Sequence, residues 1–184
     1  MVFLHHQVKA ITYGGLLVAV SIVLTRFFGV MLPIGGALAL RLSFGAIPIM
    51  IGGMLFGPAV GGAIGVVADL VGMAVNPMGG AYFPGFTLSS ALLGVLPPLI
   101  LRGTLTKELS FRRILAVVTL TNIVVAVGLN TLWLVIMYGL DPWVLLPPRL
   151  AAQVIMVPVY SFVILTICRG YRMSQSVGYV GAGQ

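Results

Sequence analysis

Charged residues are scarce in this chain. Only 7% of its 184 residues are charged, and 60% are hydrophobic, whereas about 25% of the residues in a soluble globular domain are charged. Apolar runs of about 16 to 25 residues alternate with short polar breaks, as in transmembrane helices and unlike the ten-residue alternation of a membrane barrel. The lack of charge excludes an ordinary soluble protein. It predicts an all-α integral membrane protein in a cell membrane.

Residues used for catalysis and metal binding are also scarce. Neither lysine lies in a Gly-Lys-Ser/Thr sequence, so the chain has no Walker A loop and no ATPase of its own. The two histidines are adjacent near the N-terminus and the three acidic residues are far apart in the sequence, so we expect no metal, no cofactor and no acid–base pair. The single cysteine, Cys168, excludes an intramolecular disulfide. A binding protein is therefore expected, and not an enzyme.

The apolar runs predict one membrane domain over residues 1–184. Proline and glycine mark most of the breaks between runs, and Pro97 and Pro98 should bend the fourth run. A Gly- and Ser-containing tail, residues 173–184, is expected to be disordered. The six expected helices cover residues 10–32, 42–56, 58–75, 84–101, 114–138 and 147–168.

Basic residues indicate the orientation of these helices. Six spans put both termini on one side, and all but three of the ten basic residues fall on that side, so the positive-inside rule predicts cytoplasmic termini. This topology also explains the net charge of +7 without nucleic acid as a partner. The three outward residues are Arg26, Arg41 and Arg149. Snorkelling would explain Arg26, but three arginines near one depth suggest an anion, such as carboxylates held by forked hydrogen bonds.

The stretch from residue 69 to residue 90 contains most of the other candidate residues. It joins two apolar runs through Asn76, several Gly and Pro residues and an aromatic cluster, and we interpret it as a binding loop. Tyr82, Phe83 and Phe86 would stack on a flat ring. Asp69 is costly within a membrane span, which indicates either a ligand contact or a structural pair with an arginine.

Two further helices carry polar candidates. Asn130 and Trp133 lie three residues apart near the outer end of the fifth run, and an amide in hydrocarbon requires a partner. Gln153 follows Arg149 by four residues, so both lie on one helical face. These residues are expected to face the same ligand as the loop.

Four segments resemble the substrate-binding S components of energy-coupling factor (ECF) vitamin transporters. Arg-Leu-Ser-Phe-Gly-Ala-Ile-Pro-Ile at 41–49, Gly-Met-Leu-Phe-Gly-Pro at 53–58 and Gly-x-x-x-Asp-Leu at 65–70 are similar to S components in general. Tyr-Phe-Pro-Gly-Phe-Thr-Leu-Ser at 82–89, which includes Thr87, is most similar to the folate-specific members. The resemblance covers residues 8–172.

The resemblance implies a six-helix protein that captures a vitamin at its outer face. It implies docking on a transmembrane coupling subunit driven by two cytoplasmic ATPase subunits. S components carry an Ala-x-x-x-Ala pattern on the first helix for this docking, and here Gly15 and Ala19 take those positions. Gly15 departs from the pattern but keeps the face flat.

Folate fits both the resemblance and the residue types. We expect Phe83, Phe86 and Trp133 to enclose the rings. The edges of the pterin would be bound by Asn76, Asn130, Gln153 and Asp69. The two carboxylates of the glutamate part of folate would be bound by Arg26, Arg41 or Arg149. Riboflavin, thiamin, a structural anchor subunit and a membrane enzyme are the alternatives. Thiamin is a cation that three arginines would disfavour, and riboflavin lacks the carboxylates.

Overall fold

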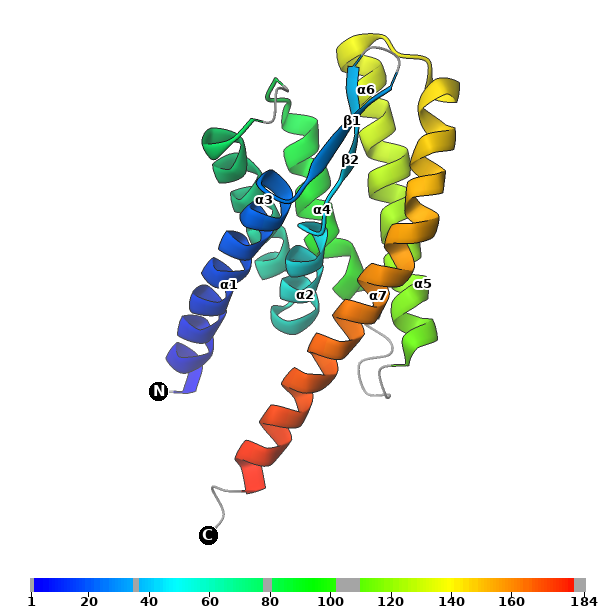
Figure 1. The fold of residues 1–184 in the computed structure, drawn as a ribbon. Coiled ribbons are helices and arrows are strands. Elements are labelled where there is room, and N and C mark those ends of the chain that lie inside the picture. Colours follow the sequence, from blue (N-terminus) through cyan, green and yellow to red (C-terminus); the bar gives the residue numbers. More distant parts are fainter. Residues whose placement is uncertain (1, 35–36, 78–80, 102–109, 181–184) are drawn as a thin grey trace.

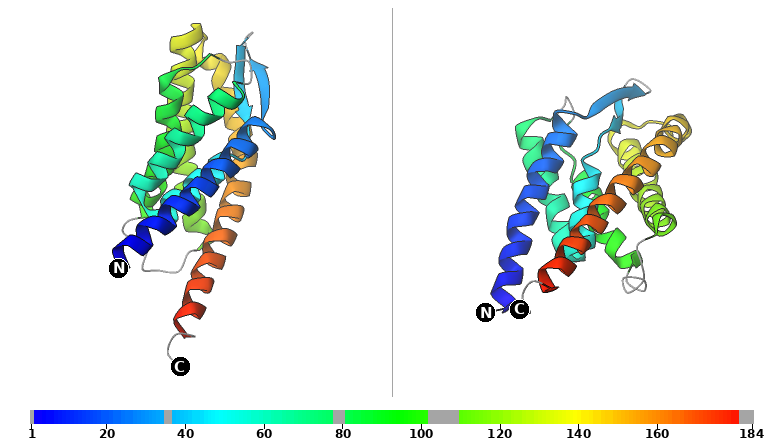
Figure 2. Two further views of the ribbon diagram at one scale, coloured as in Figure 1. Left: turned by 90° about the vertical axis from the view of Figure 1, so that its left-hand side faces the viewer. Right: turned by 60° about the horizontal axis from the view of Figure 1, so that its bottom comes forward.

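The computed structural model describes residues 2–34, 37–77, 81–101 and 110–180. A bundle of helices carries a two-stranded hairpin at one end, and the first turns of α1 and the last turns of α7 lie at the opposite end (Figures 1 and 2). The elements are α1 (Val2–Arg26), β1 (Val30–Ile34), β2 (Ala37–Leu42), α2 (Ala46–Phe56), α3 (Pro58–Val75), α4 (Pro84–Leu101), α5 (Phe111–Asn122), η1 (Ile123–Leu129), α6 (Asn130–Tyr138) and α7 (Pro142–Val180).

Within the described residues, four helices are long and apolar enough to cross a membrane. They are Pro58–Val75, Pro84–Leu101, Phe111–Tyr138 and Pro142–Tyr171. The stretch Ala10–Arg26 of α1 and the whole of α2 are apolar but shorter. A multi-pass, mainly helical membrane protein is thereby confirmed.

The third and fourth expected helices agree with α3 and α4 at both ends. Gly57 has a φ of 94°, a conformation that favours glycine, and it is followed by Pro58 at the start of α3. Backbones approach closely where α2, α3 and α4 meet. A Cβ placed on Gly61 would collide with the Gly53 backbone and the Gly94 carbonyl oxygen. The glycines of α3 are therefore part of a packing surface.

The prediction for residues 27–42 was wrong. Instead of a helix to Leu32 and a break, β1 pairs antiparallel with β2, and Val30 lies opposite Leu42. The helix ends at Arg26 because the chain turns closely at Gly29, where a Cβ would collide with the Thr25 carbonyl oxygen. A register irregularity at Pro33 fits a residue that cannot donate to the strand ladder. Helix α2 consequently begins at Ala46, four residues later than expected.

The fifth expected helix exists but is not regular. Residues Ile123–Leu129 form a π-helix between α5 and α6. The amide of Asn130 donates to the carbonyl of Val125, five residues back, instead of to that of Ala126. Helix α6 then ends at Tyr138 and is capped by Gly139, which has a φ of 65°.

The last helix is longer than predicted at both ends. It begins at Pro142 and not at Pro147 or Pro148, because the Asp141 carboxylate accepts a hydrogen bond from the Trp143 amide at 2.9 Å and caps the helix. It continues to Val180, although disorder was expected from residue 173. Only residues 181–184 of that expected tail lie outside the described part. The sequence after Pro158 contains no further proline, so no proline interrupts the last part of α7.

Candidate ligand-binding site

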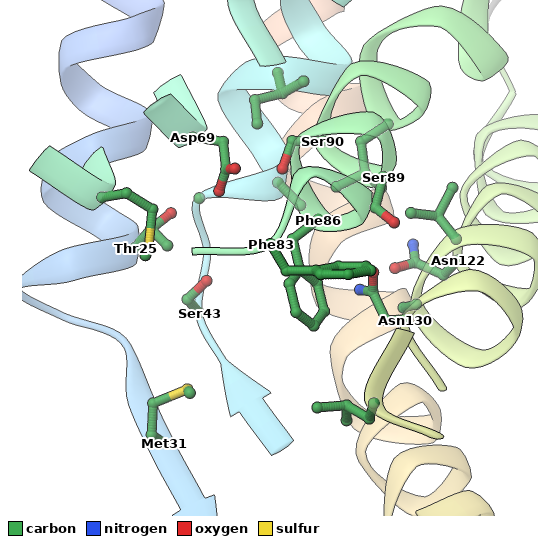
Figure 3. A pocket seen from close by; sticks show the side chains of 18 of the residues that line it. Thr25, Met31, Ser43, Asp69, Phe83, Phe86, Ser89, Ser90, Asn122 and Asn130 are labelled. Atoms are coloured by element: carbon green, nitrogen blue, oxygen red, sulfur yellow. The ribbon is translucent and has the colours of Figure 1, made fainter. Parts of the chain in front are cut away.

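A cavity of about 220 Å³ lies near the hairpin end of the bundle. Its walls come from the end of α1, the hairpin, α2, α3, α4, the α5–η1–α6 helix and α7. Figure 3 shows Asp69 on one side, Asn122 and Asn130 on the other, and Phe83 and Phe86 between them. The predicted residues that line the cavity are Asp69, Tyr82, Phe83, Phe86, Asn130, Arg149 and Gln153.

The Asp69 carboxylate is held by side chains from two other helices, α1 and α4. Its Oδ1 pairs with Arg26 Nη2 at 3.4 Å, and its Oδ2 accepts a hydrogen bond from the Thr87 hydroxyl at 2.8 Å. The Thr87 oxygen lies 3.3 Å from the Tyr82 hydroxyl. Asp69 is 9% exposed and Arg26 is 4% exposed. Of the two roles expected for this carboxylate, the pair with an arginine is present, and the side chain also reaches the cavity wall.

Arg26 and Asn76 form reciprocal hydrogen bonds with each other. Arg26 Nη1 donates to the Asn76 carbonyl at 3.2 Å, and Asn76 Nδ2 donates back to the Arg26 carbonyl at 3.1 Å. Neither residue is among those that line the cavity, and neither is Thr87. The hydrogen bonds of these three residues connect the ends of α1, α3 and α4 next to Asp69, as buried polar groups usually satisfy one another. Their predicted contacts with a ligand stay predictions.

Aromatic rings form one wall of the cavity. Phe83 and Phe86 meet edge to face, with centroids 6.1 Å apart and an interplanar angle of 72°. Trp133 lies against Phe83 at 5.7 Å, and its Nε1 donates to Ser89 Oγ at 3.0 Å. Trp133 does not line the cavity. Its predicted contact with a ligand ring stays a prediction.

Arg149 reaches the cavity from two turns inside α7. Its Nη1 donates to the Ala126 carbonyl at 2.8 Å and lies 3.4 Å from Thr131 Oγ1. Ala126 belongs to the π-helix, where the Asn130 amide has shifted to another carbonyl, and such segments occur often at functional sites. The irregular helix thus helps to hold an arginine, 6% exposed, at the cavity wall.

Two amide oxygens face this site without a protein partner. Asn130 Oδ1 and Gln153 Oε1 are buried and have no hydrogen-bond partner among the described residues. Both side chains line the cavity. A buried acceptor without a partner is costly, so a ligand with N–H or O–H groups would satisfy them.

Several lining residues were missed by the sequence reasoning. Asn122 could have been found, since it is an amide in an apolar run like Asn130, and its Nδ2 donates to the Val118 carbonyl at 2.9 Å. Hydroxyl residues carry no such signal, because they are tolerated throughout membrane helices. The polar lining residues that were not among the predicted site residues are Thr25, Ser43, Ser89, Ser90, Asn122, Tyr138 and Tyr160. Tyr160 donates to the Ser43 carbonyl. Arg41 lies in β2 opposite Met31, not at a helix start, and its side chain lies outside the described part.

A cavity of this kind in an apolar bundle defines a multi-pass membrane protein that binds a small molecule. No group of three potential metal ligands occurs among the described residues. The profile of the family described as "ECF transporter, substrate-specific component" matches residues 9–168, so the chain belongs to this family. The expectation of a transporter component that binds a substrate, and not an enzyme, is confirmed by this membership.

Relatives and solved structures agree with the assignment. The chain is 36% identical over 158 residues to "Folate transporter FolT" of Clostridium novyi (strain NT), covering 86% of this chain and 87% of the relative. It is 28% identical to "Folate transporter FolT" of Leuconostoc mesenteroides over 67% of this chain and 68% of that protein. The structure titled "Crystal structure of FolT bound with folic acid" has a TM-score of 0.70 and 35% identity, covering 84% of this chain and 89% of the other.

A second solved structure supports the fold. It is titled "Structure and mechanism of the S component of a bacterial ECF transporter", has a TM-score of 0.65 and covers 93% of this chain and 98% of the other. At 21% identity it shows a shared fold alone.

Proposed function

We propose that this chain is the folate-binding substrate-specific component of an ECF transporter. The observation that carries the proposal is the cavity, where an arginine, two buried amide oxygens without partners and a pair of aromatic rings converge. Folate combines a flat bicyclic ring, a benzoyl ring and two carboxylates, which are complementary to these groups. The two relatives and the solved structure named for folate support the same ligand.

The depth of each group along its helix suggests how folate lies. At about 1.5 Å per residue, Arg149 is roughly 10 Å from the start of α7 at the hairpin end, and Gln153 is one turn deeper. Pterin would occupy the deep part between Phe83, Phe86 and the amides of Asn130 and Gln153. The carboxylates would extend outward to Arg149. A cavity of about 220 Å³ is smaller than the about 300–1,000 Å³ typical for drug-sized ligands, so the acidic tail would fill the mouth.

We also propose six membrane crossings with cytoplasmic termini. The α5–η1–α6 segment counts as one crossing, and α1 and α2 add to the four longer helices. The cavity then opens to the outer side, and the basic residues gather on the inner side as the positive-inside rule requires. Folate would be captured outside. Its import would depend on a transmembrane coupling subunit and two cytoplasmic ATPase subunits, since the sequence has no Walker A loop.

Thermal unfolding of the detergent-purified chain tests the ligand. Folic acid or 5-formyl-folate at about 100 times its dissociation constant should add about 2.7 kcal/mol to the free energy of unfolding. Riboflavin and thiamin at the same concentrations should add none. Stabilisation by riboflavin or thiamin but not by folates would assign another vitamin, and stabilisation by none would favour a structural anchor.

A further inference from the structure

Asn122 lies at the inner end of the cavity wall that the α5–η1–α6 helix forms. Of the residues of this helix that line the cavity, it lies farthest from the hairpin end. It is buried, with 3% of its surface exposed. Asn130 follows it by eight residues, so at about 1.5 Å per residue Asn122 lies on the order of 10 Å deeper. A ligand that enters from the hairpin end would therefore reach Asn122 last.

The amide of Asn122 has a fixed orientation. Its Nδ2 donates to the Val118 carbonyl at 2.9 Å. Because a carbonyl oxygen only accepts, exchanging the two ends of the amide would place Oδ1 against another acceptor. Oδ1 is therefore turned away from Val118, and Figure 3 shows it directed into the cavity on the side of Asn130. Within the part of the chain that the structure describes, no donor is hydrogen-bonded to this oxygen.

The π-helix brings Asn122 and Asn130 onto one face. In a regular α-helix, at about 100° per residue, side chains eight residues apart would point about 80° away from each other. The π-helical residues Ile123–Leu129 lie between the two amides, and an i→i+5 turn takes up one additional residue. The pair is then oriented like residues seven apart in an α-helix, which differ by about 20°. Both side chains line the cavity.

We infer that Asn122 accepts a hydrogen bond from the 2-amino group of the ligand's bicyclic ring and thereby selects a ring that carries this group. The inference rests on the proposed function. In folate, the 2-amino group lies at the end of the pterin opposite the carbon that bears the benzoyl-glutamate chain. When the carboxylates stay near the mouth, the amino group is the deepest donor of the ligand, and it meets the deepest amide oxygen of this wall.

The chemistry of the amide gives the selectivity. An amide oxygen accepts hydrogen bonds and donates none, so an oxo group in place of the amino group would set oxygen against oxygen. The isoalloxazine ring of riboflavin has such a 2-oxo group. A mismatched polar contact in a buried site is strongly disfavoured. Asn122 is thus a ligand-contacting residue, and the π-helix positions it.

Dissociation constants for folic acid and its 2-desamino analogue, in which hydrogen replaces the amino group, test this contact. The wild-type chain should bind folic acid at least tenfold more tightly than the analogue. Asn122→Ala should weaken folic acid binding about tenfold, equivalent to about 1.4 kcal/mol. It should also bind the two ligands within about threefold of each other, because the amino group has lost its partner.

Thr119→Ala is the matched control. Thr119 Oγ1 donates to the Leu115 carbonyl at 2.7 Å, four residues back as in Asn122, and Thr119 lies outside the cavity lining. This variant loses the same kind of helix hydrogen bond and should keep the wild-type affinity and preference. Equal binding of both ligands by the wild-type chain, an unchanged preference in Asn122→Ala, or the same loss in Thr119→Ala would overturn the contact. No binding of folic acid by the wild-type chain would instead overturn the proposed function.

Discussion

Two buried arginines that the sequence could not distinguish have different surroundings. Arg26 is 4% exposed and Arg149 is 6% exposed. Arg26 faces a carboxylate and two carbonyl oxygens behind the cavity. Arg149 lines the cavity, and its Nη1 lies within hydrogen-bond distance of a carbonyl oxygen and a hydroxyl oxygen. Because Arg149 lines the cavity and Arg26 does not, the proposed function assigns the ligand carboxylate to Arg149.

Replacing each arginine by methionine should separate these roles. Arg149→Met should raise the dissociation constant of folic acid at least tenfold, about 1.4 kcal/mol, because the proposed carboxylate contact is lost. Arg26→Met should instead lower the free energy of unfolding of the ligand-free chain by about 3 kcal/mol, because Asp69 is left buried without its counter-charge. Titration with folic acid and thermal unfolding without ligand measure the two effects.

The double variant Arg26→Met, Asp69→Asn serves as the control for the charge. It should recover most of the stability lost in Arg26→Met, since no unpaired carboxylate remains. If Arg26→Met weakened folic acid binding as much as Arg149→Met with stability unchanged, the assignment of the carboxylate site to Arg149 would be wrong.

Among the residues that line the cavity, the sequence analysis identified those whose burial in a membrane costs the most free energy, and it missed the small hydroxyl residues. Asp69, Asn130, Arg149 and Gln153 stand out because polar groups in a membrane helix require partners. This free-energy cost indicates that a buried charged residue has a partner, but it does not identify the partner. Arg26 and Arg149 were therefore both predicted to bind a ligand carboxylate. Ser89 is small and hydrogen-bonds easily within any helix, so nothing in the sequence distinguishes it. Its position beside Trp133 depends on how α4 packs against α6.

At the scale of the elements, glycines set the distance between α2, α3 and α4. Gly53, Gly61 and Gly94 bring three backbones into contact, and Gly65 packs in the same way against Ser90. Because Ser90 lines the cavity, the close packing of α3 against α4 determines where one wall of the site lies. Close contact through small residues is the usual way for helices to associate in a membrane.

Gly61→Ala should therefore destabilise the chain. Overpacking costs about 1–3 kcal/mol, and the added methyl group would meet backbone atoms that cannot turn aside. Gly170→Ala is the matched control, since a Cβ there meets nothing within 4 Å; it should be neutral or slightly stabilising. Thermal unfolding of both variants without ligand makes the comparison, and equal stability of Gly61→Ala and the wild-type chain would contradict the packing described.

The predicted elements were correct where the sequence contains strong start and stop signals. The start of α3 is marked by Gly57 and Pro58, and the start of α4 by Pro84. The hairpin was missed because residues 30–34 and 37–42 are nearly continuous apolar runs, for which periodicity does not separate helix from strand. The π-helix was missed for another reason. Its Ala126 carbonyl accepts a hydrogen bond from Arg149, 23 residues away in the sequence, and a contact of this range is not visible in the local sequence.

The whole molecule separates the proposed ligand site from the proposed docking surface. The cavity lies toward the hairpin end of the bundle. One side of helix α1 packs against α2 and α3. Gly15 and Ala19 of the same helix are exposed. A Cβ on Gly15 would meet nothing within 4 Å. A partner helix could therefore approach α1 closely at these residues without touching the groups that line the cavity.

This separation predicts that docking can be abolished while folate binding is retained. Ala19→Trp places a large ring where close backbone approach is proposed, so it should prevent association with the coupling subunit. Uptake of labelled folate by cells that express the whole transporter should fall at least tenfold, and the dissociation constant of the purified variant should stay within about threefold of wild type, less than about 1 kcal/mol. Val154→Trp, at a position on α7 that is 74% exposed, is the control and should leave uptake unchanged. Co-purification of the coupling subunit with each variant identifies the step affected.

If Ala19→Trp supported normal uptake, the docking surface would lie elsewhere. If instead it lost folate binding, α1 would be coupled to the cavity, and the connection to test would be the Arg26–Asp69 pair at the end of that helix.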